Sequence, residues 1–254
     1  MRKDYEKVIA EYLNSRKFTV LWSGGKDSTA TLLWVLNHVH HSRFNVVYTE
    51  ITGNTHPDVN KYVYQLSKQL GISNRLVVAK RNDIDFFSCM EKFGIPLPGH
   101  YRWCLHYFKV EVWKKVVNTV VVIGVKHDDS RIRKAKRRDS IFQVFRVTNT
   151  VTVAPIWFWS KNDVIRYLQH HGIPENPCYR KYLHSGNCMF CPYHREPAIV
   201  RTLSDPEWRE KIISALSKVN PKGRISKQIW KKWMRLAHQT NIFDYINQNP
   251  PGNN

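Results

Sequence analysis

The chain has 254 residues, of which 42% are hydrophobic and 13% aromatic; this composition excludes an intrinsically disordered chain and suffices for a substantial core. Its 40 Lys and Arg residues outnumber its 20 Asp and Glu residues, and the formal net charge of +20 predicts polyanionic partners, either nucleic acid or phosphorylated small molecules. No apolar run approaches the roughly 20 residues of a membrane span, and the N-terminal segment mixes charged with apolar residues, unlike a signal peptide. We therefore expect a cytoplasmic protein with no membrane partner, in which the five cysteines are reduced.

Short β-branched runs alternate with helical patterns through the first part of the chain. Strands are expected at 18–22, 45–50, 75–80 and 119–125, with one or two more within 142–156. Between the first four, apolar residues recur at helical spacing over 28–40, 57–71 and 105–117. This alternation predicts an α/β fold, a doubly wound parallel sheet covered by helices on both faces.

The last third of the chain has a different character. Ser160 is predicted to cap a helix that ends before Gly172. Residues 172–198 are irregular and rich in Pro, Gly and Cys, and 204–240 return to a helical pattern. We therefore expect an α/β nucleotide-binding domain over 1–171 and an appendage over 172–254, in which a cysteine-containing segment and C-terminal helices pack on that domain.

The segment LWSGGKDSTATLLWVL, residues 21–36, joins the first expected strand to the first expected helix. Glycines at this position allow close backbone approach, and the start of a helix offers free N–H groups to an anion. The loop is not a Walker A motif, because Asp27 stands where that motif has a hydroxyl residue. A plain strand–turn–helix connection is the alternative.

The six residues SGGKDS are the signature of the PP-loop superfamily (adenine nucleotide alpha hydrolase-like, or HUP-like, folds), which the chain resembles at every position of the motif. The resemblance implies that the loop holds the β- and γ-phosphates of ATP and leaves the α-phosphate to react. It implies catalytic roles for Lys26 and Asp27, with Lys26 on phosphate oxygens and Asp27 on Mg²⁺. The phosphate-binding residues so implied are Ser23, Gly24, Gly25, Lys26, Asp27 and Ser28.

Four further segments resemble the phosphoadenylyl-sulfate (PAPS) reductase family within that superfamily. They are TGNTHPD from Thr52, RWC…K from Arg102, GVKHDDSRIR from Gly124, and the helix after Pro155 with the PENPCY segment that follows it. They occur in family order from residue 18 to about 195. The third segment has Lys126 where the family has arginine. Further nucleotide-binding residues implied by these segments are Thr52, Gly53, Asn54, Arg102, Gly124, Ser130, Arg131 and Arg133.

A basic run, SRIRKAKRRD, occupies residues 130–139 and has six basic residues between positions 131 and 138. Arg131 and Arg133 could clamp a phosphate or sulfate, because the guanidinium fork matches such oxyanions. The remaining four could contact a nucleic-acid backbone or lie on a solvated loop.

Cys188-x-x-Cys191 is by itself ambiguous between half a zinc site, a redox pair and part of an iron–sulfur site. The resemblance implies a [4Fe-4S] cluster held by Cys104, Cys188 and Cys191, with Cys104 also a catalytic candidate. Cys178 could be the fourth ligand, or one iron could stay open to another ligand. Zinc and metal-free thiols are the alternatives, and Cys89 is expected in the core.

The sequence departs from the family's reductases in one respect. Those enzymes use a cysteine in a C-terminal segment, whereas this sequence has no cysteine after Cys191, so the nucleophile is missing or supplied differently. We expect a PAPS-reductase-like enzyme of sulfur metabolism that acts on ATP, adenylyl-sulfate or PAPS with a thiol or sulfur donor protein. ATP-dependent thiolation of tRNA or DNA is the alternative, a non-catalytic nucleic-acid-binding protein is another, and a homodimer is open.

Overall fold

The computed structural model describes residues 2–40, 44–97, 102–129, 141–146 and 149–238. Its centre is a six-stranded sheet with the strand order β3-β2-β1-β4-β6-β5. All neighbouring pairs are parallel except β5 and β6, which pair antiparallel at one edge. The strands are β1 (Phe18–Trp22), β2 (Phe44–Thr49), β3 (Leu76–Ala79), β4 (Val120–Val122), β5 (Phe142–Phe145) and β6 (Thr150–Val153).

Burial explains why these runs form the inner strands of a sheet. Phe18, Val20 and Trp22 of the central strand β1 have at most 1% of their surface exposed, as expected for a strand covered on both faces. The expected alternation and the α/β class are confirmed, and the segment 142–156 forms two strands.

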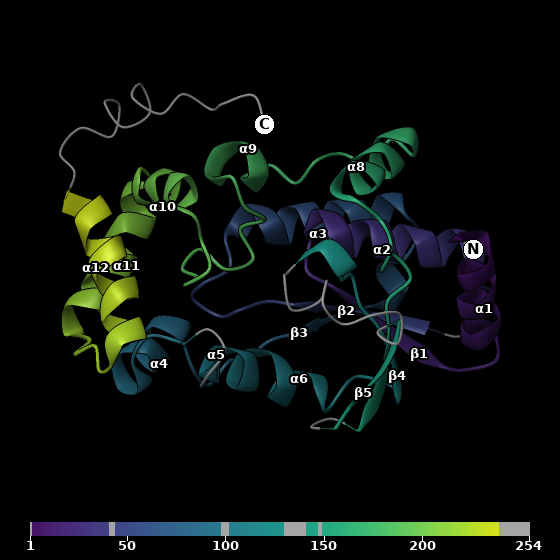
Figure 1. The fold of residues 1–254 in the computed structure, drawn as a ribbon, viewed down its shortest axis with the longest axis horizontal. Helices are drawn as coiled ribbons and strands as arrows, with labels where there is room; N and C mark the ends of the chain where they lie inside the picture. Colours follow the sequence, from purple (N-terminus) through teal and green to yellow (C-terminus); the bar gives the residue numbers. More distant parts are fainter. Residues whose placement is uncertain (1, 41–43, 98–101, 130–140, 147–148, 239–254) are drawn as a thin grey trace.

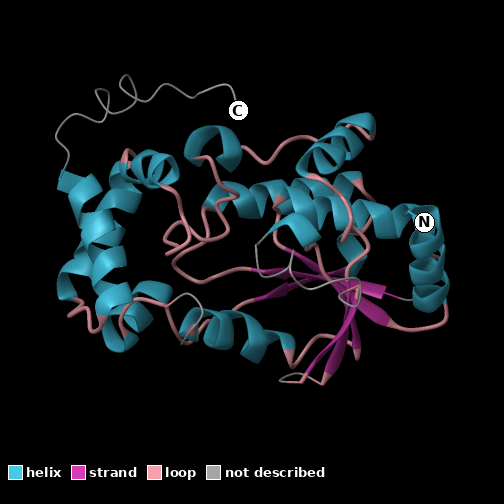
Figure 2. Cartoon of the chain, viewed as in Figure 1, coloured by secondary structure: helices cyan, strands magenta, loops and turns pink. Residues whose placement is uncertain are grey.

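Helices cover both faces of the sheet (Figure 2). On one side lie α2 and α3, with α8 against α2; on the other side lie α5 and α6, as Figure 1 shows. Ser160 and Asp163 form a reciprocal capping box at the start of α8, so the predicted helix start is confirmed. The helices are α1 (Arg2–Asn14), α2 (Lys26–His38), α3 (Pro57–Gln69), α4 (Phe86–Phe93), α5 (Trp103–Leu105), a π-helical turn (His106–Val110), α6 (Glu111–Trp113), α8 (Lys161–His170), α9 (Cys178–Tyr182), α10 (Glu196–Leu203), α11 (Pro206–Lys218) and α12 (Arg224–His238).

The last three helices, α10 to α12, lie beyond the carboxyl ends of the strands, at the end of the molecule opposite α1 (Figure 1). Trp208, Ile212 and Trp233 of these helices are buried in the same core cluster as Ile9 of α1 and Val20 of β1. One continuous core therefore joins the sheet to the C-terminal helices. Among the described residues, no helix is both long and apolar enough to cross a membrane.

Candidate active site

The SGGKDS loop follows β1 directly, and its own hydroxyls fix its shape. The Ser28 hydroxyl donates to the carbonyl of Gly25 at 3.0 Å and accepts from the Ser23 amide at 3.2 Å. Gly24 has a φ of +70°, and a Cβ there would lie 3.0 Å from Cγ1 of Val59 on α3. A side chain at position 24 would thus be strained and crowded, and helix α2 begins at Lys26 with its first amides at the loop.

The segment after β4 closes the loop from the sheet side. A Cβ at Gly124 would lie 2.6 Å from Cα of Ser28, so only glycine allows these two backbones to approach so closely. Lys126 is 5% exposed and its ammonium contacts Asp27 Oδ1 at 2.5 Å and Asp129 Oδ1 at 2.9 Å. Burial opposes the charge of Lys126, but the hydrogen bonds that its ammonium donates to Asp27 and Asp129 outweigh this effect and raise the pKa of Lys126. The carboxylate of Asp27, in the SGGKDS loop, is therefore ion-paired with Lys126, which follows β4.

Residues 175–179 cover the loop from the other side. The Lys26 amide donates to the Tyr179 hydroxyl at 3.1 Å, while the Lys26 ammonium lies 3.1 Å from Glu175 Oε1 and 4.3 Å from the centre of the Tyr179 ring. Asn176 donates to the Gly24 carbonyl at 2.9 Å. Burial raises the pKa of Tyr179 to about 12, so its hydroxyl stays protonated. The PENPCY motif was visible in the sequence, but its contact with the loop was not predicted.

A cavity of about 350 Å³ lies beside this part of the loop. Gly24, Lys26 and Tyr179 form one wall, and Tyr62 of α3, residues of α8, the segment 173–176 and Arg180 form the rest. The cavity therefore adjoins the amide end of α2, where an anion is favoured.

The TGN segment after β2 supports the cysteine turn. Asn54 is fully buried; its Oδ1 accepts from the Phe190 amide at 2.8 Å, and its Nδ2 donates to the Phe190 carbonyl at 3.0 Å. Thr52 donates its hydroxyl to the Arg81 carbonyl, and a Cβ at Gly53 would collide with the Asp85 carboxylate. Both polar atoms of the Asn54 amide group are thus hydrogen-bonded to Phe190, one of the two residues between Cys188 and Cys191.

Three of the predicted cysteine ligands line one pocket. Cys104 enters it from α5, and Cys188 and Cys191 from the loop before α10, around a volume of about 110 Å³. Arg102 and Lys109 line the same pocket. Three soft sulfur donors and two cations, from segments about eighty residues apart in the sequence, therefore meet at the carboxyl edge of the sheet.

The surroundings of these thiols determine their protonation. Burial raises the pKa of Cys104 and of Cys188, and it raises that of Cys191 to about 12. The charges of Arg102 and Lys109 act in the opposite direction on Cys104 and Cys188. In the part of the chain that the structure describes, no three His, Cys, Asp or Glu side chains are already arranged to hold a metal ion. The three cysteines thus line one pocket, but their side chains are not already positioned as ligands of one metal ion.

Cys178 does not line this pocket. It is buried at the start of α9, and its Sγ would lie 2.6 Å from a Cβ placed on Gly186. Cys89 is buried in the core as predicted. The structure brings together Cys104, Cys188 and Cys191 but not Cys178.

Residues 17–194 match the family described as the phosphoadenosine phosphosulfate reductase domain. The chain belongs to this family. The match spans well over half of the chain and includes the SGGKDS loop and all three pocket cysteines. The chain is thus a PP-loop nucleotide-binding protein of an enzyme family. A comparison with curated protein sequences gives no significant match.

Three solved structures illustrate the likeness of fold. A phosphoadenylyl-sulfate reductase from Candida auris in a phosphate complex is 15% identical, with 69% of this chain and 83% of that chain covered and a TM-score of 0.49. Candida glabrata FMN adenylyltransferase is 18% identical, with 67% and 52% covered and a TM-score of 0.44. The U34-tRNA thiolase NcsA from Methanococcus maripaludis with its [4Fe-4S] cluster is 11% identical, with 94% and 79% covered and a TM-score of 0.45. These likenesses describe the course of the backbone alone.

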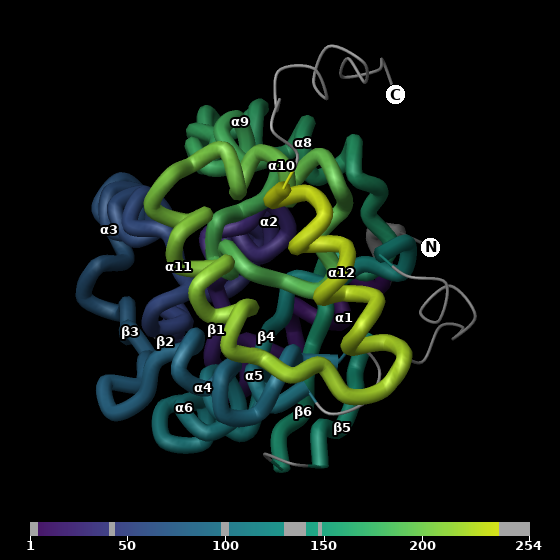
Figure 3. Tube along the Cα trace, turned by 90° about the vertical axis from the view of Figure 1, so that its left-hand side faces the viewer, coloured from purple at the N-terminus to yellow at the C-terminus, as the bar shows by residue number. Residues whose placement is uncertain are grey.

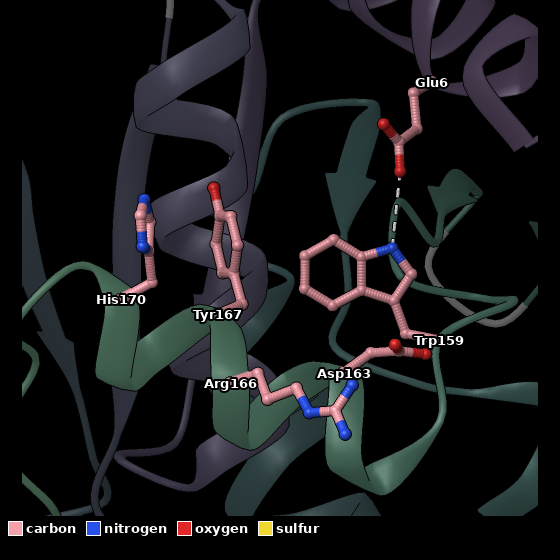
Figure 4. Close-up of a pocket in the computed structure, with 6 residues that line it drawn as sticks. All are labelled: Glu6, Trp159, Asp163, Arg166, Tyr167 and His170. Carbon is pink, nitrogen blue, oxygen red and sulfur yellow. Dashed lines mark hydrogen bonds between the residues drawn. The ribbon is translucent and has the colours of Figure 1, made fainter.

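The remaining predicted anion-binding residues of this PAPS reductase domain are not among those that the structure describes. Ser130, Arg131 and Arg133, with the rest of the basic run, lie outside the described residues. A larger cavity of about 440 Å³ lies between α1 and α8, where Trp159 donates to Glu6 at 3.3 Å (Figure 4). It contains none of the predicted site residues, so we place the candidate site at the loop and the cysteine pocket.

Proposed function

We propose that this PAPS reductase domain protein is an enzyme of sulfur metabolism that binds an adenine nucleotide on the SGGKDS loop and carries out sulfur chemistry at the cysteine pocket. The observation that carries the proposal is the meeting of Cys104, Cys188 and Cys191 with Arg102 and Lys109 in one pocket. Half-buried thiols beside two cations are a setting typical of reactive or metal-binding cysteines, which are partly exposed and lie in electropositive surroundings.

The residues between the loop and the pocket support a single site. Asn176 hydrogen-bonds the loop at Gly24, and Asn54 hydrogen-bonds Phe190 beside the pocket cysteines. The chain from 176 to 191 therefore runs from one to the other along the carboxyl edge of the sheet, which is where open α/β sheets bind ligands.

On the loop, the amides at the start of α2 would bind phosphate oxygens, and the Lys26 ammonium would exchange its ion pair with Glu175 for one with the phosphate. Tyr179 would give up its hydrogen bond with the Lys26 amide to the ligand. Lys126 would keep the Asp27 carboxylate oriented while part of the negative charge of that carboxylate is neutralised. A Mg²⁺ ion bound to Asp27 would share the carboxylate of Asp27 with the Lys126 ammonium.

The donor set at the pocket fits an iron–sulfur cluster, since three thiols are soft ligands suited to iron and the flanking cations would offset the negative charge of a thiolate cluster. Cys104, Cys188 and Cys191 would hold it. When bound, a [4Fe-4S] cluster would supply electron transfer or a site for sulfur. Three donors also leave one position for a further ligand, and zinc is the competing occupant.

Two reactions are consistent with this site. In the first, adenylyl-sulfate or PAPS accepts two electrons from a thiol donor and releases sulfite with the nucleotide monophosphate or bisphosphate. In the second, an oxygen of tRNA or DNA attacks the α-phosphate of ATP, pyrophosphate leaves, and sulfur from a donor then displaces AMP. The net charge of +20 favours the second candidate.

The test is anaerobic purification followed by separate incubations with adenylyl-sulfate and a thiol donor, with PAPS and a thiol donor, and with ATP together with a sulfur donor and tRNA or DNA. We expect brown protein with about four irons per chain, and AMP with pyrophosphate from ATP or sulfite from a sulfonucleotide. Colourless, zinc-loaded protein would exclude the cluster, and no product from any nucleotide would exclude the enzyme.

Single substitutions distinguish the cysteines that hold the cluster from nearby residues that do not. Cys104→Ala should lose iron, whereas Cys178→Ala should retain it because the Cys178 thiol packs on Gly186 outside the pocket. Asp27→Ala should stop nucleotide turnover. Equal iron loss in both cysteine variants would instead include Cys178 among the ligands.

A further inference from the structure

Helix α12 has a marked division between its two faces. Its 15 residues, RISKQIWKKWMRLAH, include no Asp or Glu. One face is buried against the other C-terminal helices and the cysteine segment, through Ser226, Ile229, Trp233, Leu236 and Ala237. This buried face accounts for the tryptophans of the helix, and it leaves the basic residues unexplained by packing.

The opposite face carries a basic stripe, defined as Arg224, Lys227, Lys231, Arg235 and His238, all of them exposed. Their spacing of three or four residues puts them in one row along the helix, over a length of about 21 Å at 1.5 Å per residue. Among the described residues, Arg235 pairs with Glu196, while Arg224, Lys227 and Lys231 have no ion-pair partner. Unpaired cations in a row repel one another, and a polyanion with regularly spaced charges would relieve this repulsion. Figure 3 shows α12 on the outside at this end of the molecule.

Contacts place the stripe next to the cysteine pocket. Arg235 of the stripe pairs with Glu196, five residues after Cys191, and Lys232, the residue after Lys231, donates to the His194 carbonyl at 2.7 Å. The segment that follows Cys191 therefore lies against α12.

An exposed aromatic side chain lies in the short segment between Cys191 and His194. Tyr193 is 56% exposed and lines the cysteine pocket. The guanidinium of Arg102 lies 5.5 Å from the centre of its ring. An exposed aromatic ring with a neighbouring arginine is suited to stacking with a base.

We propose that the basic stripe of α12 and Tyr193 bind a single-stranded segment of nucleic acid, with phosphates along the stripe and one base stacked on Tyr193 at the mouth of the cysteine pocket. A single strand is required, because the bases of a duplex are already stacked. The proposal rests on the proposed function, since it makes a nucleotide of the bound strand the acceptor of the sulfur chemistry at that pocket. An anionic membrane fits less well, because Ile225 is the one large hydrophobic residue of α12 with an exposed side chain and interfacial helices bury an apolar face in lipid.

The test uses the full-length protein and a fluorescein-labelled 12-nucleotide RNA of mixed sequence, with binding followed by fluorescence anisotropy without ATP. Lys227→Glu/Lys231→Glu should weaken binding at least tenfold and lower the slope of log K against log salt by about 1.4 for two lost phosphate contacts. The matched control is Lys17→Glu/Lys161→Glu. Both control lysines are exposed, they have no ion pair within the described ranges, and they lie toward the other end of the sheet. This control variant changes the net charge by the same amount as the stripe variant and should alter RNA affinity less than threefold.

Tyr193→Ala should weaken binding about tenfold, and Tyr64→Ala, at a tyrosine that is 48% exposed on α3, should have no effect. Equal loss in both lysine double variants would reduce the effect to net charge and overturn the proposal. Equal affinity for a duplex of the same sequence, or tight binding to phosphatidylserine vesicles that only the stripe variant abolishes, would also overturn it. Iron content and ATP binding should be unchanged in the stripe variant, so failure here is distinct from failure of the nucleotide and cysteine site.

Discussion

Replacing Asn54 by alanine removes the side chain that supports the Cys188-x-x-Cys191 turn. The substitution leaves the amide and the carbonyl of Phe190 without their hydrogen-bond partners at 2.8 and 3.0 Å, and Phe190 is 1% exposed. Each unsatisfied buried group costs about 1–3 kcal/mol. We therefore expect the free energy of unfolding to fall by about 2–5 kcal/mol, a large part of the 5–15 kcal/mol typical of a folded protein.

The assay is urea unfolding of anaerobically purified protein, together with the rate at which a thiol reagent modifies Cys188 and Cys191 in metal-free protein. Modification should become faster in Asn54→Ala, because the turn between the two cysteines loses its support. The control is Asn162→Ala at an exposed position of α8, which should change stability by less than about 0.5 kcal/mol. A loss below about 1 kcal/mol with unchanged thiol reactivity would refute the assigned role of Asn54.

Three further changes test other parts of the site. Gly124→Ala should weaken ATP binding at least tenfold in calorimetry, because the new Cβ would lie 2.6 Å from Cα of Ser28 and displace the loop. Lys126→Met should lower the free energy of unfolding in urea by about 2 kcal/mol, since it leaves Asp27 without its buried cation. Burial and the neighbouring His194 and His56 lower the pKa of His184 from 6.5 to about 3. The unfolded chain therefore binds a proton there first, and stability should fall as pH drops below 6.5, by about 2 kcal/mol at pH 5; His184→Gln should remove this part of the urea–pH profile.

Each of these has a matched control. Gly71→Ala, at a positive φ with no atom within 4 Å, should leave ATP affinity unchanged. Lys161→Met should not alter stability, and exposed His170→Gln should leave the pH profile as it was. Unchanged ATP affinity in Gly124→Ala, unchanged stability in Lys126→Met, or an identical pH profile in His184→Gln would contradict the corresponding assignment.

The sequence alone was sufficient where the signal is local. SGGKDS is a contiguous motif between a β-branched strand and a helix, so the loop, its place after β1 and the parallel α/β fold could all be predicted. The capping box of Ser160 and Asp163 is local too, and the structure has it. Such features depend on spacing along the chain, and spacing is what a sequence records directly.

Tertiary structure decided what lies next to these local features. No local pattern predicts that Tyr179 and Glu175 contact Lys26, because they are about 150 residues away along the chain. Asn54, predicted to bind nucleotide, has its whole amide committed to Phe190. Cys178 is ten residues from Cys188 in sequence but not in its pocket, because helix α9 turns its thiol toward Gly186. Side-chain partners across the sheet edge depend on how helices and loops pack, and this packing follows from the whole core.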